Sequence, residues 1–237
     1  MTNSWDDPRV KRGTTAQLAD WRKRIAAGDG RLGWKVAFGT PAIMDTLKIS
    51  APLTGFLVRR NQLPSGGTIS LKGWTKPIAE PEIAVHMGKD LAAGADLATV
   101  AGAIGALGPA IELVDPVMAP QADNIETVLA GDISQRHVVL GEASKARAGG
   151  SVSGLIATIF RNDVQGGSTT DPEANTGKLL DRVQHVANVL SAFGEKLAAG
   201  DVIITGSVLP PVPLDASDRR FSFTLVPLGD VSINFSH

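Results

Sequence analysis

The stretch Lys76-Pro77-Ile78-Ala79-Glu80-Pro81-Glu82-Ile83-Ala84-Val85 carries two carboxylates inside an otherwise apolar run that is typical of a β-strand. Side chains two residues apart on a strand project from the same face, so we expect Glu80 and Glu82 to point the same way. Two like charges held this close repel unless a cation lies between them. A hard divalent cation is the usual partner of such oxygen ligands. The intervening proline cannot donate to a sheet, which indicates a strand edge or a bulge.

A third carboxylate lies in a second apolar run, Ala110-Ile111-Glu112-Leu113-Val114-Asp115. An unpaired charge at Glu112 would be costly there, so we expect it to join Glu80 and Glu82 as an oxygen ligand. Without His or Cys in the set, Mg²⁺ or Mn²⁺ is favoured over Zn²⁺. Asp115 is a weaker candidate, because a regular strand turns it to the opposite face from Glu112. The competing interpretation is a solvated strand face or simple ion pairs, without a metal.

The composition narrows the class of protein. The 237 residues have a formal net charge of −1 and contain no cysteine and no tyrosine. This excludes disulfides, thiolate metal sites and a cysteine nucleophile, and gives no reason to expect a nucleic-acid or anionic-membrane partner. The polar start of the sequence lacks the apolar core of a signal peptide, and no apolar run approaches the ~20 residues that cross a bilayer. We therefore expect a cytoplasmic protein.

The patterning predicts an α+β fold with a strand-rich core rather than a regular βαβ fold. Periodicity and capping signals predict helices over 14–27, 41–47, 96–107, 124–130 and 179–197. Strands are expected over 34–38, 68–71, 77–87, 110–115, 136–141, 155–160 and 202–204, followed by a hairpin over 221–225 and 231–235. Residues 161–177 are polar and are expected to form a mobile surface loop. The polar segment 61–67 suggests a boundary between a small helical N-terminal part, 1–60, and a β-rich core, 61–237.

Two further features are candidates for substrate contacts. Lys35 lies in the middle of an apolar strand, where it either extends to solvent at a sheet edge or pairs with a substrate carboxylate near the metal. There it would neutralise charge or move a proton. The segment Thr205-Gly206-Ser207 follows an apolar strand and is either a cradle for a carboxylate or a plain turn.

The chain resembles the fumarylacetoacetate hydrolase family, in particular its 2-keto-4-pentenoate hydratase branch. Matching strings occur in family order from the first strand to near the C-terminus. They are Gly33-Trp34-Lys35-Val36, Ala79-Glu80-Pro81-Glu82-Ile83-Ala84, Gly88-Lys89-Asp90-Leu91, Ala110-Ile111-Glu112-Leu113-Val114-Asp115, Val139-Leu140-Gly141 and Gly200-Asp201-Val202-Ile203-Ile204-Thr205-Gly206-Ser207. The most specific element is the pair of glutamates followed by a third about thirty positions later.

The resemblance implies a β-rich core, a Mg²⁺ or Mn²⁺ site, a homo-oligomer, and a small 2-oxo acid or its enol as substrate, often from the degradation of aromatic rings. It implies that the metal ligands are Glu80, Glu82 and Glu112. It also implies a catalytic lysine, Lys35, in the substrate pocket. The matching substrate-binding positions are Ser134, Thr205, Gly206 and Ser207.

Two departures from the family pattern bear on the reaction. Hydratases of this branch typically carry an Asp in a Pro-Asp-Phe-Gly string, whereas this chain has Pro52-Leu53-Thr54-Gly55. Hydration, decarboxylation and hydrolytic C–C cleavage therefore stay open, as does a member that binds a metal or small acid without turnover. Bulky residues follow the pocket serine, and among them Arg136 either reads a second carboxylate or points to solvent.

Overall fold

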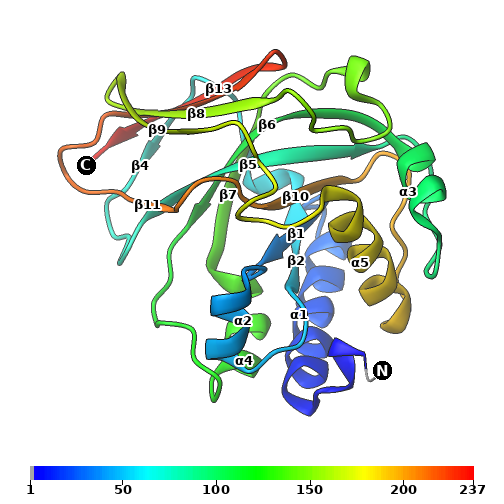
Figure 1. Ribbon diagram of the computed structural model, residues 1–237. Coiled ribbons are helices and arrows are strands. Elements are labelled where there is room, and N and C mark those ends of the chain that lie inside the picture. The colour runs from blue at the N-terminus through cyan, green and yellow to red at the C-terminus, as the bar shows by residue number, and fades with distance from the viewer. Residues whose placement is uncertain (1–2) are drawn as a thin grey trace.

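Two β-sheets pack against each other in the computed structural model, which describes residues 3–237 (Figure 1). The eight-stranded sheet has the order β2-β1-β10-β5-β6-β7-β3, and β11 pairs with β5. Its strands are β1 (Arg31–Ala37), β2 (Leu53–Val58), β3 (Gln62–Leu63), β5 (Ile78–Met87), β6 (Ile104–Val114), β7 (Gln135–Leu140), β10 (Val202–Ser207) and β11 (Val212–Pro213). The second sheet has the order β4-β13-β12-β8-β9. Its strands are β4 (Thr68–Ser70), β8 (Ile156–Arg161), β9 (Val164–Thr169), β12 (Arg220–Val226) and β13 (Gly229–Ser236).

The helices gather on one side of the sheets, where α1, α2, α4 and α5 lie below them in Figure 1. They are α1 (Pro8–Ala26), α2 (Pro41–Leu47), α3 (Leu97–Ala103), α4 (Ile125–Ala130) and α5 (Leu179–Ala192), with 3-10 turns at Ser4–Asp6, Arg59–Asn61, Asp132–Ser134 and Lys145–Arg147. Each longer helix buries one face; on α5 this face includes Val183, Val186 and Leu190. This arrangement confirms the predicted strand-rich α+β fold.

The main hydrophobic core lies between the two sheets. The predicted C-terminal hairpin is confirmed as β12 and β13, and Phe221 and Phe223 alternate inward so that neither is exposed to solvent. Both hairpin strands contact β6 of the other sheet. A second hydrophobic cluster joins α1, α2 and α4 to β2, with Leu47, Leu53 and Leu129 at its centre. This second cluster fixes the helices that later form one wall of the cavity.

Strand β1 approaches β10 closely because Gly33 has no side chain. Gly33 has φ +154°, and a Cβ there would lie 1.9 Å from the carbonyl oxygen of Val202 on the parallel neighbour β10. The next residue, Trp34, is fully buried, and its indole donates a hydrogen bond to Asp201 at 3.1 Å. These contacts hold the backbone on either side of Lys35.

Two of the expected helices end too late in the sequence. The helix expected over 96–107 ends at Ala103, although Asp96 caps it through Thr99 N–H, because Ile104 already begins β6. Pairing with the ten-residue β5 overrides the local helix signal. Helix α5 ends at Ala192 rather than 197, because Leu197 pairs across to Leu91.

Two of the longer strands were not predicted from the sequence patterns, and neither were the two-residue strands β3 and β11. Residues 164–169, expected as part of a mobile loop, form β9, which pairs with β8 through a turn at Asn162 and Asp163. Both turn residues have positive φ, the conformation that a two-residue hairpin turn of this kind requires. Strand β2 over 53–58 is fully buried on both faces and has no alternation to reveal it.

The boundary suggested at residues 60 and 61 does not coincide with a break in the sheet. Strands β1 and β2 lie in the same sheet as β5 and β6, although they precede the boundary in sequence. Residues 1–60 therefore contribute strands as well as helices, and α1 packs against α4 from the later part.

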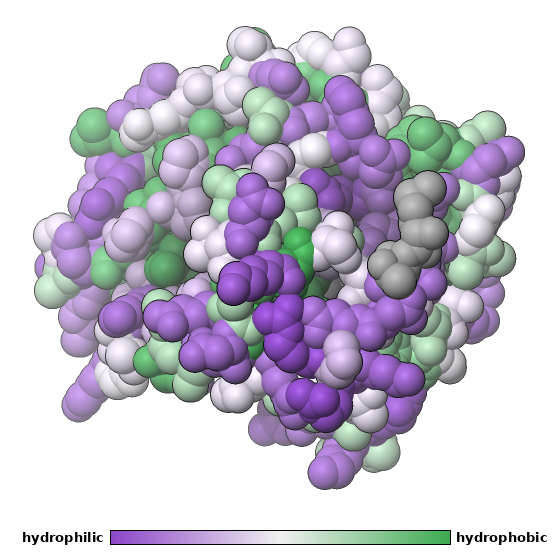
Figure 2. Space-filling view, turned by 60° about the horizontal axis from the view of Figure 1, so that its bottom comes forward, coloured by the Kyte–Doolittle hydropathy of each residue, from purple (hydrophilic) through white to green (hydrophobic). Residues whose placement is uncertain are grey.

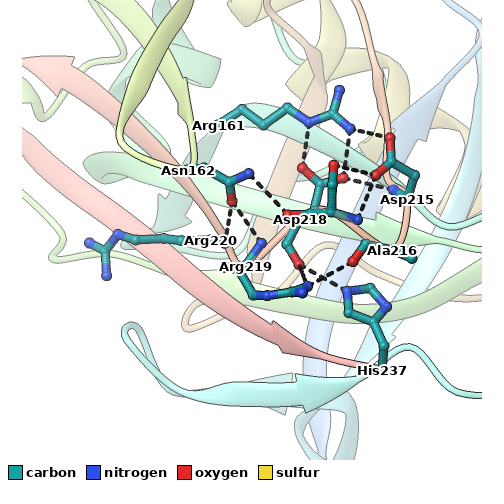
Figure 3. A network of polar contacts seen from close by, with 9 residues as sticks. Arg161, Asn162, Asp215, Ala216, Asp218, Arg219, Arg220 and His237 are labelled. Carbon is teal, nitrogen blue, oxygen red and sulfur yellow. Dashed lines mark hydrogen bonds and ion pairs between the residues drawn. The ribbon is translucent and has the colours of Figure 1, made fainter.

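A polar network ties the loop before β12 to the turn between β8 and β9 (Figure 3). Arg161 pairs with the fully buried Asp218 and, at 2.7 Å, with Asp215. Asn162 accepts hydrogen bonds from two backbone N–H groups of the same loop, and the C-terminal His237 contacts the carbonyl of Asp218. This network holds the loop before β12 and the C-terminal residue against the second sheet.

The surface on the helical side is mostly hydrophilic, with hydrophobic residues in small separate patches (Figure 2). Within residues 3–237, none of the helices combines the length and the apolar character needed to span a bilayer.

We expect Gly33→Ala to destabilise the fold by roughly 3 kcal/mol, because the new methyl group overlaps the β10 backbone and the φ is unfavourable for alanine. Gly102→Ala is the matched control, since nothing lies within 4 Å of its added Cβ in helix α3. That change should stabilise the protein by about 0.5–1 kcal/mol. Urea unfolding curves measure both, and equal effects would contradict the close β1–β10 approach.

Candidate active site

The three glutamates converge because β5 and β6 pair in one register. Glu80 lies directly opposite Glu112, and Glu82 lies opposite Ala110. Directly opposed residues share a face, and Glu82 is on the same face as Glu80, so all three carboxylates project together. One oxygen from each lies within 4.8 Å of the other two. Glu82 and Glu112 are buried, and Glu80 is partly exposed.

Lys35 is buried beside this cluster. Its ammonium group pairs with Glu112 and lies 3.5 Å from the carbonyl oxygen of Ile133. The residue opposite it on β2 is Gly55, and a Cβ there would lie 2.7 Å from the Lys35 side chain. Glycine at this position therefore leaves room for the lysine to run toward Glu112. The interpretation of Lys35 as a side chain that extends to solvent is wrong, since only 1% of it is exposed.

The cluster carries an excess of negative charge. Burial, followed by the charges of Glu112 and Glu80, raises the pKa of Glu82 well above its usual value. Burial and the charge of Glu112 raise the pKa of Glu80 to about 7. Burial alone would lower the pKa of Lys35, but Glu112, Asp132 and Glu80 raise it above its ordinary value. One ammonium group thus faces several carboxylates, and another cation would be stabilised here.

The orientation of Glu82 leaves one oxygen free. Its Oε2 accepts a hydrogen bond from the backbone N–H of Gly206 at 2.6 Å. Its buried Oε1 has no hydrogen-bond partner among residues 3–237. Buried carboxylate oxygens are normally paired, so this free oxygen marks a place for a ligand. An all-oxygen set of three carboxylates fits a hard divalent cation such as Mg²⁺ or Mn²⁺.

Asp132 is a site residue that sequence reasoning missed. It is buried near Lys35, its Oδ1 accepts a hydrogen bond from Phe56 N–H at 2.8 Å, and its Oδ2 has no partner in the described part of the chain. Burial raises its pKa well above the usual range, although Lys35 and the N–H of Phe56 oppose this. The only signal in the sequence was an acidic residue two positions before Ser134.

A cavity of about 480 Å³ opens over the cluster. Its wall includes Lys35, Glu80, Glu112, Ser134 and the segment Thr205–Ser207, so the structure brings most of the expected site residues to one space. Glu82 lies just behind this wall. The cavity also includes two segments that no sequence signal indicated, 38–40 and 175–176.

The segment Thr205–Ser207 is not a plain turn. Its two hydroxyl groups and the N–H of Gly206 already donate hydrogen bonds within the protein. The hydroxyl of Thr205 donates to the carbonyl of Ile83 at 3.2 Å, and that of Ser207 donates to the carbonyl of Leu209 at 2.6 Å. Gly206 has φ +101°, a conformation that favours glycine, and directs its N–H to Glu82. The segment therefore orients a carboxylate of the protein itself.

Other residues singled out from the sequence lie elsewhere. Asp115 accepts hydrogen bonds from the backbone N–H groups of Thr75 and Lys76, so it holds a loop. Arg136 stacks over the ring of Trp74, with 5.2 Å to the ring centroid, and does not line the cavity. Leu53 belongs to the second hydrophobic cluster.

The comparisons with known proteins agree with this geometry. No model of a known protein family matches the chain. The sequence is 31% identical to 2-hydroxyhexa-2,4-dienoate hydratase of Comamonas testosteroni, over 100% of this chain and 90% of that protein. It is 26% identical to 2-keto-4-pentenoate hydratase 2 of Dechloromonas aromatica, over 93% and 84% of the two chains.

The solved structures extend the comparison. The 4-oxalocrotonate decarboxylase of Pseudomonas putida G7, complexed with magnesium and adipate, aligns with a TM-score of 0.81 and 26% identity over 93% of this chain and 83% of that one. Fumarylpyruvate hydrolase of Pseudomonas aeruginosa shares the fold, with a TM-score of 0.68 and 14% identity over 87% and 89% of the chains. The chain belongs to the fumarylacetoacetate hydrolase family, within its 2-keto-4-pentenoate hydratase branch.

Proposed function

We propose that this protein is a Mg²⁺- or Mn²⁺-dependent lyase of the hydratase type, which acts on a 2-hydroxydienoic acid or its 2-oxo form. The observation that carries the proposal is the convergence of three carboxylates, two of them buried, beside a buried lysine at the wall of a cavity. The hydratase relatives and the magnesium bound by the decarboxylase neighbour support it.

Glu80, Glu82 and Glu112 are the proposed metal ligands. The free Oε1 of Glu82 and the excess negative charge support this assignment. When bound, a divalent cation supplies Lewis-acid polarisation of the carbonyl of a 2-oxo acid. The N–H of Gly206 then serves to fix the orientation of Glu82. Glu80 and Glu112 form part of the cavity wall, so a cation that they held would be accessible to a substrate.

Lys35 is the proposed catalytic residue. Its ammonium group has three protons, one of which is directed at Glu112 and one toward the carbonyl of Ile133. A remaining proton is available to a substrate oxygen, where it would neutralise charge that develops during enolisation. Ser134 lines the same wall, and we propose that its hydroxyl contacts the acid end of the substrate. Thr205, Gly206 and Ser207 line the same wall, where we propose that they contact the substrate while the N–H of Gly206 holds Glu82.

Hydration is the first candidate reaction and decarboxylation of a related 2-oxo acid is the second. Leu53, at the position of the usual hydratase Asp, is 2% exposed within a hydrophobic cluster and supplies no carboxyl group. This difference from the hydratases supports decarboxylation as the second candidate. Asp132 places a different carboxyl group near Lys35, so an acid is present although it comes from another segment. Hydrolytic C–C cleavage would use the same activated acid.

A homo-oligomer is also proposed. Ile156 and Val226 are exposed apolar neighbours on the second sheet, and Val164 on its outer strand β9 is 70% exposed. Exposed apolar groups at a sheet edge favour association with another chain. Sedimentation velocity measures the oligomeric state directly.

The reaction is tested by incubating the Mg²⁺-loaded protein with 2-hydroxyhexa-2,4-dienoate and with 2-hydroxymuconate, and following water addition and CO₂ release by NMR. We expect water addition as the faster reaction. Lys35→Met should lower kcat by about 10²- to 10⁴-fold, because a positioned proton donor is lost. Lys76→Met is the control on an exposed lysine. Unchanged turnover in Lys35→Met would remove that residue from the mechanism.

Metal binding is tested by thermal unfolding with and without Mg²⁺. At a hundred times its dissociation constant the ion should add about 2.7 kcal/mol to the wild-type protein. Glu82→Gln should abolish this gain, yet the metal-free variant should match or exceed the wild type in stability, because a buried charge is removed. The surface variant Glu126→Gln should keep the full gain. A full metal response in Glu82→Gln would exclude the proposed ligand set.

The raised pKa of Glu80 predicts a pH effect in chelator-treated protein. A carboxyl group whose folded pKa is about 7 and whose ordinary value is 4.5 stabilises the fold fully below pH 4.5, and this stabilisation is lost as pH rises through 7. Relative to Glu80→Gln, the metal-free wild type should lose on the order of 3 kcal/mol of unfolding free energy between pH 4.5 and pH 8. Denaturant titrations at several pH values measure this difference. A difference that is constant with pH would show that Glu80 titrates normally.

A further inference from the structure

We propose that the substrate carries a single carboxylate and an uncharged, apolar tail. Ile43, Met118 and Val128 favour this tail over a tail that ends in a second carboxylate. The inference rests on the proposed function, since it concerns the substrate of the same cavity. It distinguishes an alkyl-substituted dienoic acid from a dicarboxylic acid.

The charges of the cavity wall support this choice. Among the described residues, the wall contains three charged side chains, namely Lys35, Glu80 and Glu112. The one cation is already paired with Glu112 at the carboxylate cluster. A second carboxylate at the far end of a substrate would therefore meet no free cation. Burying such a charge without a partner is strongly unfavourable.

Two further arginines, Arg136 and Arg182, lie outside the cavity wall. Arg136, which the sequence left open as a reader of a second carboxylate, lies over Trp74 outside the cavity wall. Arg182 lies behind the wall, where it donates hydrogen bonds to the carbonyls of Thr176 and Gly39 at 2.5 and 3.1 Å. The guanidinium group of Arg182 thus has partners within the protein, and Arg136 is an exposed residue stacked on Trp74. Neither side chain belongs to the wall.

The part of the wall that carries Ile43, Met118 and Val128 is apolar. Thr40, Ser134, Asn175 and Thr176 also line the cavity, and their polar groups are uncharged. Ile43 comes from α2 and Val128 from α4, and both pack in the second hydrophobic cluster. Met118 lies on the segment between β6 and α4 and is 41% exposed. Four prolines complete this region: Pro116, Pro120, Pro210 and Pro211. Proline has no N–H, so these residues also remove backbone donors that could solvate a carboxylate.

The same wall should strengthen the binding of a substrate with an apolar tail. Each additional methylene that enters the cavity leaves water and contacts hydrophobic side chains. We expect kcat/KM to rise by about 3- to 10-fold when 2-hydroxypenta-2,4-dienoate is extended to 2-hydroxyhexa-2,4-dienoate. The diacid 2-hydroxymuconate has a similar carbon chain but ends in a carboxylate. Its kcat/KM should be at least about 10²-fold lower than that of the hexadienoate.

Paired arginine variants test the role of the wall. Met118→Arg places a cation at the wall, and the partly exposed position should tolerate it. The ratio of kcat/KM for hexadienoate to kcat/KM for muconate should fall by at least about tenfold. Val117→Arg is the matched control, because Val117 is 70% exposed and does not line the cavity. It should leave the ratio unchanged.

Binding measurements separate this inference from the proposed function. Isothermal titration of the Mg²⁺-loaded protein with 2-oxohexanoate and with 2-oxoadipate compares matched acids without requiring turnover. Tighter binding of the monoacid by at least about tenfold is expected, and Met118→Arg should reverse or level it. Absence of turnover on every dienoic acid would overturn the proposed lyase activity while this preference still stands. Equal or tighter binding of the diacid by the wild type would overturn the inference.

Discussion

The site depends on three carboxylates being held together in the interior with one ammonium group among them. Glu82 and Glu112 are almost completely buried, and the ion pair from Lys35 reaches Glu112 alone. Burial and the charge of Glu112 raise the pKa of Glu80 and of Glu82, and repulsion between like charges destabilises the fold unless a cation enters. The surrounding structure holds the carboxylates together despite their repulsion, and the cluster therefore favours binding of a hard divalent ion.

The sheet supplies the rigidity that such a cluster requires. Glu80 and Glu112 are fixed opposite each other near one end of two long paired strands, where the ladder holds both backbones in place. Gly33 and Gly55 have complementary roles on either side of Lys35, since one allows β1 to approach β10 and the other leaves space for the lysine. The two glycines thus determine where the Lys35 ammonium group lies, because they leave room for strand β1 and for the lysine side chain.

The helices determine what else enters the cavity. The cluster of α1, α2, α4 and β2 holds Ile43 and Val128 at the wall, away from the strands that carry the carboxylates. The three glutamates and Lys35 come from the sheet, and the apolar part of the wall comes from the helical layer and the proline-containing segments.

Strand periodicity was sufficient to predict that Glu80 and Glu82 share a face, and alternation was sufficient to predict the hairpin around Phe221 and Phe223. Both depend on spacing along a single segment, which the chain alone determines. The register that sets Glu80 against Glu112, the approach of Asp132 to Lys35 and the strand identity of residues 164–169 depend on partners distant in sequence. Only the tertiary structure decided these, because pairing energy between strands outweighs local propensity and leaves no mark on either segment by itself.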